Sequence, residues 1–328
     1  IKFNHMKKIK NVLAIALVAL VLPALFFSSC KTEDDNVAFE TLQTYLTTNS
    51  FDLDDMLASW IQTNFELVDS VQNDADATND FYILDIRSAT DFAAGHIKGA
   101  VNTTLAGVVA EATNAGTLPI LIVCYTGQTA SHACIALRLS GYPTAQTLIW
   151  GMSGWNVDFD SWTASTGSIG VGNANWEAAP GAIATNMEFD LPVIETEETE
   201  GAAILAERVT AMLAGGFIGV TGADVLAAPA DYFINNYWTV EDVEHYGNIK
   251  GAYRILPLTV AGGEIKNLDP SKKVVTYCWT GQTSSMVTAY LNILGYDAYS
   301  LKFGANSMIY SELTSHKWGA SKAFSYER

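Results

Sequence analysis

The sequence has few basic residues and few cysteines. It contains 18 Lys and Arg against 35 Asp and Glu, which gives a formal net charge of −17 at pH 7. Binding of nucleic acid depends on clustered Lys and Arg, so this balance argues against a nucleic-acid partner. The 4 cysteines include no Cys-x-x-Cys pair and no spacing that suits zinc. We therefore expect neither nucleic acid nor a metal ion.

The composition is otherwise that of a folded globular protein. Hydrophobic residues make up 49% of the 328 residues and charged residues only 16%. This proportion supplies ample apolar side chains for packed cores and is not typical of a disordered chain. A chain of this length is most often divided into two domains.

The N-terminal segment has the order of an export signal. Met6 is followed by three lysines and then by an apolar run over residues 12–27. The run is shorter than the roughly 20 residues that a membrane-spanning helix needs, and a charged start before it is typical of a secretory signal. Cys30 follows two serines and resembles the modified cysteine of a bacterial lipoprotein. We predict a signal peptide over 1–29, a lipid on Cys30 and a tether over 30–38.

We expect such a lipid to attach the protein to the outer membrane of the cell envelope, with the protein facing the periplasm or the cell surface. If Cys30 carries a lipid, Cys124, Cys134 and Cys278 remain. An odd number of cysteines in an exported chain does not indicate a disulfide framework, so these thiols need another explanation.

The chain contains an internal repeat. Residues 124–131 (CYTGQTAS) and 278–285 (CWTGQTSS) share six of eight residues. Three further pairs occur in the same order: GHIKGA at 95–100 with GNIKGA at 247–252, LRLSGY at 137–142 with LNILGY at 291–296, and LIWGMSGW at 148–155 with LKFGANSM at 301–308. The partners are 152 to 154 residues apart, which indicates duplication of one domain.

The repeat predicts the domain organisation. We expect a first domain over 39–165 and a second over 201–328. The segment between them, 166–200, is rich in small and polar residues and ends in an acidic run. This composition is typical of a linker.

Each copy has the pattern of an α/β domain. Residues 81–85, 120–124 and 274–278 are short apolar runs, as expected for buried parallel strands. Apolar residues at helical spacing follow each cysteine motif and stop at Gly141 and Gly295. A strand, a loop and a helix in this order place the loop at the carboxyl edge of a parallel sheet, where such sheets form their sites. We predict an α/β fold with a central, mainly parallel sheet flanked by helices in each domain.

The cysteine loops, 124–129 and 278–283, have the residues of an anion-binding turn. The fourth residue of each is glycine, which allows a positive φ, and the sixth is threonine, whose hydroxyl could cap the following helix. A tight turn before a helix directs several N–H groups inward and binds anions. A cysteine sulfur at its centre would have a lowered pKa and act as a nucleophile.

Both loops resemble the active-site loop of the rhodanese superfamily, which begins with the nucleophilic cysteine, has glycine fourth and often ends in threonine. The family's upstream D-x-R and G-H-I-x-G-A elements match Asp85, Arg87 and residues 95–100. The resemblance implies two rhodanese-like domains that transfer sulfane sulfur through a cysteine persulfide, with no metal or organic cofactor. The implied donors are of the thiosulfate, 3-mercaptopyruvate or polysulfide class, and the acceptor is a thiol, a cyanide-like molecule or a partner protein.

On this resemblance Cys124 and Cys278 are the expected catalytic residues. Neither loop contains Arg or Lys, so a small sulfur-containing anion would be held by backbone amides and neutral side chains. The loop residues expected to bind it are Tyr125, Thr126, Gly127, Gln128, Thr129, Trp279, Thr280, Gly281, Gln282 and Thr283. The second copy departs from the family elsewhere, because Asn235 and Tyr237 align with Asp85 and Arg87, and Asn248 replaces His96.

Several polar residues have a structural interpretation. We expect Asp85 and Arg87 to form an internal ion pair and His96 to fix a turn by hydrogen bonding. We expect His132 to face solvent from the helix after the first loop. Cys134 falls on the apolar face of that helix and should be a buried structural thiol.

The sequence also bears on three functions other than sulfur transfer. A phosphatase of this loop type needs an arginine six positions after the cysteine, where this chain has Ala130 and Ser284. A dithiol oxidoreductase is disfavoured by the lack of a Cys-x-x-Cys pair. The main alternative is a non-catalytic rhodanese-like module that binds an anion or a partner protein. The retained cysteines favour catalysis, and the missing cationic residues favour binding.

Overall fold

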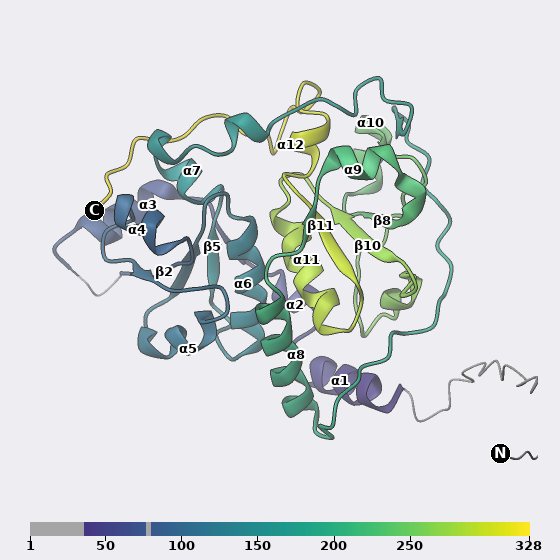
Figure 1. Ribbon diagram of the computed structural model, residues 1–328, viewed down its shortest axis with the longest axis horizontal. Coiled ribbons are helices and arrows are strands. Elements are labelled where there is room, and N and C mark those ends of the chain that lie inside the picture. The colour runs from purple at the N-terminus through teal and green to yellow at the C-terminus, as the bar shows by residue number, and fades with distance from the viewer. Residues whose placement is uncertain (1–35, 77–79) are drawn as a thin grey trace, which may run out of the picture. The chain divides into compact units, whose positions relative to one another are not determined.

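The computed structural model describes residues 36–76 and 80–328 (Figure 1). The predicted signal peptide over 1–29 and the predicted lipid site Cys30 lie outside the described residues, as does most of the predicted tether. Among the helices in the described part of the chain, none combines the length and the apolar character that crossing a bilayer requires.

Two parallel sheets form the centre of the structure. The first has the order β1-β5-β4-β2-β3 and the second the order β7-β11-β10-β8, and every pairing within them is parallel. The strands of the first sheet are β1 (Ile61–Gln62), β2 (Tyr82–Asp85), β3 (Val101–Asn102), β4 (Ile120–Val123) and β5 (Gln146–Leu148). Those of the second are β7 (Gly219–Val220), β8 (Tyr232–Asn236), β10 (Lys273–Tyr277) and β11 (Ala298–Leu301).

Helices flank both sheets (Figure 1). Those of the first half are α1 (Val37–Thr48), α2 (Leu53–Met56), α3 (Phe65–Asn73), α4 (Ala89–Ala94), α5 (Val108–Ala112), α6 (Gln128–Leu139) and α7 (Gly151–Trp155). Those of the second half are α8 (Gly201–Gly215), α9 (Gly222–Ala227), α10 (Val240–Tyr246), α11 (Gln282–Ile293) and α12 (Ala305–Met308). Short 3₁₀ helices occupy Thr113–Ala115, Val157–Phe159, Thr163–Ser165, Pro229–Asp231 and Glu264–Asn267. The predicted α/β fold with parallel sheets between helices is therefore confirmed.

The sequence explains why the central strands are in the middle of their sheets. All four residues of β4 are buried, and so are the last four of β10. Strands covered on both faces are mainly apolar, which is the pattern of the buried residues of these two strands. Each is followed directly by the cysteine loop and then by α6 or α11.

Helices α6 and α11 pack against each other, so the two repeats share a core. One hydrophobic cluster contains Leu137 of α6 and Leu291 of α11, together with Leu42 of α1 and Leu205 of α8. Because α6 and α11 begin at the two cysteine loops, this packing also brings the loops of the two halves together.

Two segments outside the parallel sheets contact the rest of the structure: residues 166–200 and the C-terminal tail. In the segment predicted as a linker, Gly167 N–H donates to Asn306 O at 2.8 Å, and β6 (Trp176–Glu177) pairs antiparallel with β9 (Asn248–Ile249). The C-terminal tail instead contacts the first half, where Trp155 Nε1 donates to Ser325 O at 2.8 Å. In Figure 1 the yellow tail extends accordingly toward α3 and α4.

Candidate functional site

Each cysteine stands where its central strand ends. Cys124 follows β4 and Cys278 follows β10, so both lie at the carboxyl edge of a parallel sheet. Gly127 and Gly281 have φ values of 85° and 76°, which a side chain would strain. These glycines are also the N-caps of α6 and α11, and neither helix has a side-chain cap.

The threonines at the ends of the loops do not cap the helices. Thr129 and Thr283 lie inside the first turns of α6 and α11, which begin one residue earlier than expected. The capping prediction was wrong because the positive-φ glycine itself starts the helix. Both threonines are partly buried.

Backbone amides are directed at both sulfurs. Cys124 Sγ accepts hydrogen bonds from Gly127 N–H at 3.1 Å and Ala130 N–H at 3.3 Å. Cys278 Sγ accepts from Ser284 N–H at 3.4 Å and donates to Ser284 Oγ at 3.6 Å. A negative charge on either sulfur would therefore face N–H groups and the positive end of a helix dipole.

Burial opposes these amides. The exposed fractions of Cys124 and Cys278 are 1% and 2%. Burial raises the pKa of the Cys124 thiol, and hydrogen bonds from the backbone of Ala130 and its loop neighbours only partly offset it. The predicted fall in the pKa of Cys124 was therefore wrong, because loss of hydration outweighs the amides.

The two loops contact each other through their glutamines. Gln128 Oε1 accepts from Phe303 N–H of the second half at 2.8 Å. Gln282 Nε2 donates to Thr126 O of the first half at 3.5 Å. Both glutamine side chains are buried. These two residues, which are predicted to bind substrate, thus join the two halves.

This contact also requires glycine in the loops. A Cβ on Gly127 would lie 1.9 Å from Gln282 Nε2, and a Cβ on Gly281 would lie 2.5 Å from Gln128 Oε1. The fourth loop position thus needs glycine both for its positive φ and for the approach of the opposite loop.

A model of one protein family matches part of the chain. Residues 67–158 match the model of the family described as rhodanese-like domain. The chain contains a rhodanese-like domain. The matched residues lie within the first copy, predicted over 39–165.

Solved structures with low sequence identity resemble parts of this chain. A thiosulfate sulfurtransferase from Pseudomonas aeruginosa is 15% identical over 90% of this chain and 50% of that chain, with a TM-score of 0.29. Reduced CoADR-RHD from Bacillus anthracis is 21% identical over 33% of this chain and 18% of its own, with a TM-score of 0.25. A rhodanese-related protein from Thermoplasma volcanium is 18% identical over 28% of this chain and 91% of its own, with a TM-score of 0.23.

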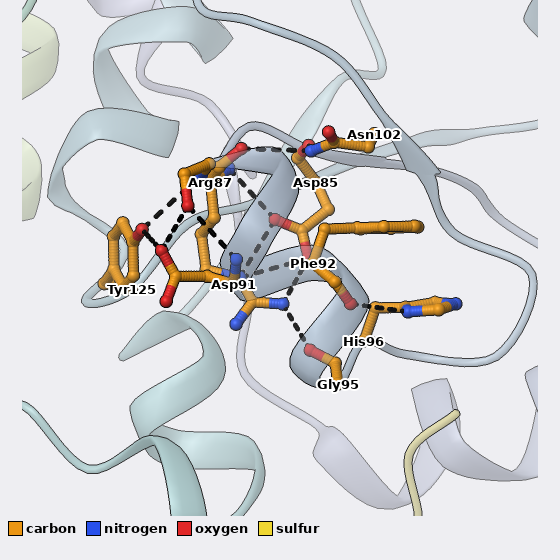
Figure 2. A network of polar contacts seen from close by, with 9 residues as sticks. Asp85, Arg87, Asp91, Phe92, Gly95, His96, Asn102 and Tyr125 are labelled. Atoms are coloured by element: carbon orange, nitrogen blue, oxygen red, sulfur yellow. Dashed lines mark hydrogen bonds and ion pairs between the residues drawn. The ribbon is translucent and has the colours of Figure 1, made fainter. Parts of the chain in front are cut away.

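In the rhodanese-like domain, a buried ion pair supports the site. Arg87 Nη2 lies 2.6 Å from Asp85 Oδ2, and both side chains are buried (Figure 2). Arg87 also donates to Gly95 O at 2.6 Å, and Asn102 Nδ2 donates to Asp85 O at 2.9 Å. The predicted pair thus joins the end of β2 to the end of α4 and to β3.

His96 makes local hydrogen bonds, as the sequence predicted. Its Nδ1 lies 2.9 Å from Phe92 O, and its ring stacks on Phe92 with centroids 3.8 Å apart (Figure 2). His96 N–H donates to Glu327 O of the C-terminal tail at 2.9 Å.

Tyr125 extends the network to the loop. It is 38% exposed, and its hydroxyl donates to the carboxylate of Asp91 (Figure 2). Hydrogen bonds from Ser88 and Tyr125 hold the pKa of Asp91 below its ordinary value. The guanidinium of Arg87 lies 5.8 Å from the Tyr125 ring centroid, a cation–π distance. Sequence reasoning missed Asp91, although Ser88-x-x-Asp91 is a capping pattern.

The register of the strands corrects the alignment of the second half. Asp85 pairs with Val123, the last residue of β4, and Asn236 pairs with Tyr277, the last residue of β10. Asn236 is therefore the counterpart of Asp85, and the prediction that named Asn235 was wrong by one residue. The motif spacing varies between the copies, so a shift of one residue could not be seen in the sequence.

The same shift makes Trp238, and not Tyr237, the counterpart of Arg87. The Trp238 ring stacks on Trp279 with centroids 4.2 Å apart, where the rhodanese-like domain has Arg87 beside Tyr125. Aromatic stacking thus replaces the ion pair and its cation–π contact. Asn248 also takes a different partner from His96, because its Nδ2 donates to Ala182 O at 2.8 Å.

The remaining predicted loop residues have local partners. Thr126 Oγ1 accepts from Gln128 Nε2 at 3.1 Å, and Thr280 Oγ1 accepts from Gln282 N–H at 3.3 Å. Trp279 is partly buried, with its second face stacked on the His316 ring at 5.3 Å.

Two residues of α6, His132 and Cys134, are fully buried. His132 was expected to face solvent, but it is fully buried and its ring meets Phe217 edge-on at 5.9 Å. That prediction was wrong because α11 and the second half cover this face. Burial lowers the pKa of His132 to about 4. Cys134 is buried as expected, and burial raises its pKa to about 11.

Proposed function

We propose that both halves are rhodanese-like domains and that the protein transfers sulfane sulfur through a cysteine persulfide. One observation carries the proposal. In each half a single cysteine follows the central parallel strand, and its Sγ accepts at least one backbone hydrogen bond from the loop or first helical turn that follows. This arrangement suits a nucleophile whose charged forms need stabilisation without a cationic side chain.

The chemistry requires two displacements at sulfur. The cysteine thiolate attacks the outer sulfur of a donor such as thiosulfate, and the donor's S–S bond breaks as sulfite leaves with the electron pair. The persulfide then gives its outer sulfur to an attacking thiolate or cyanide-like acceptor, and the cysteine leaves as a thiolate. The inward-directed amides stabilise the negative sulfur at both stages.

Access to the sulfur requires movement of the loop. With Cys124 and Cys278 only 1% and 2% exposed, a donor reaches either sulfur only after a covering side chain moves. A surface cavity of about 410 Å³ in the second half is lined by Tyr246 and His245 but not by Cys278. Tyr246 meets Trp279 of the loop edge-on at 5.3 Å, so one ring contact separates this cavity from the second residue of the loop.

Intact-mass spectrometry tests the function. The reduced protein is incubated separately with thiosulfate, 3-mercaptopyruvate and polysulfide. We expect the protein to gain the mass of single sulfur atoms, and cyanide to remove them. The matched control replaces Cys124 and Cys278 with serine and keeps Cys134, and it should gain nothing.

Absence of an adduct on folded, reduced protein with every donor would overturn sulfur transfer. The alternative, a non-catalytic rhodanese-like module that binds or senses in the cell envelope, would then account for the loops. An adduct that persists in the double variant would place the chemistry outside both loops.

We also propose, from the sequence, that a lipid on Cys30 holds the protein on a membrane of the cell envelope. Metabolic labelling with a fatty acid tests this. Labelling should be lost in Cys30→Ala and kept in Cys134→Ser. Equal labelling of both variants would contradict the proposed anchor.

A further inference from the structure

A pair of buried hydroxyl groups lies beside Cys278. Ser284 Oγ is 3.6 Å from Cys278 Sγ and 2.8 Å from Ser300 Oγ. Ser300 Oγ in turn donates to Gly281 O at 3.3 Å. Both serine side chains are fully buried. The hydroxyls therefore form a continuous chain from the sulfur, through the first turn of α11 and β11, to the loop backbone.

The first half lacks this chain. Ala130 stands six positions after Cys124, as Ser284 does after Cys278, and it offers the sulfur only its backbone N–H at 3.3 Å. The two loops have the same glycine conformation and the same helix start. Cys124 Sγ also accepts from Gly127 N–H at 3.1 Å, whereas the bonds of Cys278 Sγ are with Ser284. The chain itself thus provides a natural comparison of a cysteine loop with and without a hydroxyl.

A hydroxyl suits a group whose charge changes during a reaction. It can accept from a thiol and, after rotation about its C–O bond, donate to a thiolate or persulfide. As Ser284 turns toward the sulfur, Ser300 can donate to Ser284 in place of Gly281 O. Only the hydroxyl hydrogens reorient, and the thiol proton leaves to water or buffer. A hydrogen bond to a charged acceptor is roughly twice as strong as a neutral one, so the chain favours the anion.

We propose that Ser284, supported by Ser300, is a positioning residue for the anionic sulfur of Cys278, and that it makes Cys278 the sulfur carrier in preference to Cys124. The inference rests on the proposed sulfur transfer. It deepens that function by stating which half carries the sulfur and which side chain distinguishes the halves.

Reciprocal substitutions test the role of Ser284. Ser284→Ala gives the second loop the residue of the first, and Ala130→Ser does the reverse. Isotope-labelled cysteine Cβ shifts are followed by NMR against pH, with signals assigned from single Cys→Ser variants. This readout does not depend on reagent access to a buried sulfur.

We expect Ser284→Ala to move the titration midpoint of Cys278 upward by about one pH unit, the equivalent of one hydrogen bond to an anion. Donor loading of Cys278 should slow about tenfold, since one such unit is a tenfold change. Ser284→Thr, which keeps the hydroxyl, should restore the midpoint. Ala130→Ser should lower the midpoint of Cys124.

The outcomes separate the two proposals. An unchanged Cys278 midpoint in folded Ser284→Ala, with donor loading intact, overturns the role of Ser284 and leaves sulfur transfer standing. Failure of the unsubstituted protein to load sulfur overturns sulfur transfer, while the NMR midpoints still report whether Ser284 stabilises the anion. An unchanged titration midpoint of Cys124 in Ala130→Ser also counts against the inference, since it shows that a hydroxyl at this position has no effect on the sulfur.

Discussion

The two halves hold nearly the same cysteine loop in different surroundings. In the first half a buried ion pair of Asp85 and Arg87 lies behind the loop, and the Tyr125 hydroxyl donates to Asp91 of α4. In the second half Trp238 stacks on Trp279 at the corresponding place. The strand–loop–helix unit therefore does not depend on one kind of support, and a match at the loop does not predict the residues behind it.

The difference extends to the sulfurs. Both cysteines are almost fully buried, and Cys124 Sγ accepts from two backbone N–H groups where Cys278 Sγ accepts from one. Cys278 additionally contacts a hydroxyl, and Cys124 contacts none at the corresponding position because Ala130 occupies it. The comparison indicates that the halves have kept the fold of the loop while diverging in how they stabilise charge.

Removal of one charge from the buried ion pair of Asp85 and Arg87 should have the largest effect on the free energy of unfolding. Arg87→Ala leaves the Asp85 carboxylate buried without its partner, and we expect a loss of about 3–5 kcal/mol in the free energy of unfolding. Urea denaturation monitored by circular dichroism measures this. The control Asp85→Asn plus Arg87→Trp copies the second half and should cost less, because no unpaired charge remains. An equal or greater loss in the control would show that the supports are not interchangeable.

Loss of the hydrogen bonds that Asp52 accepts from the second half should have the next largest effect on the free energy of unfolding. This buried carboxylate accepts from Val260 N–H and Ala261 N–H of the second half, each at 2.9 Å, and from Leu53 N–H at 2.7 Å. Asp52→Ala should lower the free energy of unfolding by about 2–3 kcal/mol, since buried N–H groups lose a charged acceptor. The exposed neighbour Asp54, changed to Ala, should have little effect in the same denaturation assay. Equal effects would contradict this assignment.

The ionisation of Cys124 gives a smaller, pH-dependent effect. Because burial raises its pKa, a smaller fraction is thiolate at neutral pH than in an ordinary cysteine, and that fraction grows as the pH increases. Alkylation mapped by peptide mass spectrometry should be slow near neutrality and faster in alkali. Burial raises the pKa of Cys134 to about 11, so it should also react slowly near neutrality. Labelling of Cys124 at neutral pH as fast as a free cysteine would contradict the burial argument.

The smallest expected effect concerns Asp91. Tyr125→Phe removes one of the hydrogen bonds that lower its pKa, so the pKa should rise toward the ordinary value of 3.8. Ser88→Ala should raise it further, because the Ser88 hydrogen bond is the larger cause. NMR titration of the Asp91 carboxyl measures both changes. No change in either variant would show that the network does not stabilise the carboxylate.

The sequence predicted the features that depend on local pattern. The apolar runs before Cys124 and Cys278 are the central strands, and the helices that follow stop near Gly141 and Gly295. Strand length, hydrophobicity and turn residues determine these elements within one repeat. The placement of each cysteine at a sheet edge follows from that order.

Features that depend on contacts between distant residues could not be predicted. His132 is buried because the second half covers α6, and the glutamines of the loops are used for contact across the halves. The counterpart of Asp85 required the observed strand register to identify Asn236. The balance of burial against amides at Cys124 likewise depends on the packed structure rather than on the loop sequence.

Peptide mapping after donor loading tests the central claim most directly. Unsubstituted protein, Cys124→Ser and Cys278→Ser are treated with the same sulfane donor, and the persulfide is located by mass spectrometry. The account predicts that Cys124→Ser still carries sulfur on Cys278, and that Cys278→Ser loses most of the loading. Full loading of Cys124 in the Cys278→Ser variant, with none on Cys278 in the reciprocal variant, would contradict it.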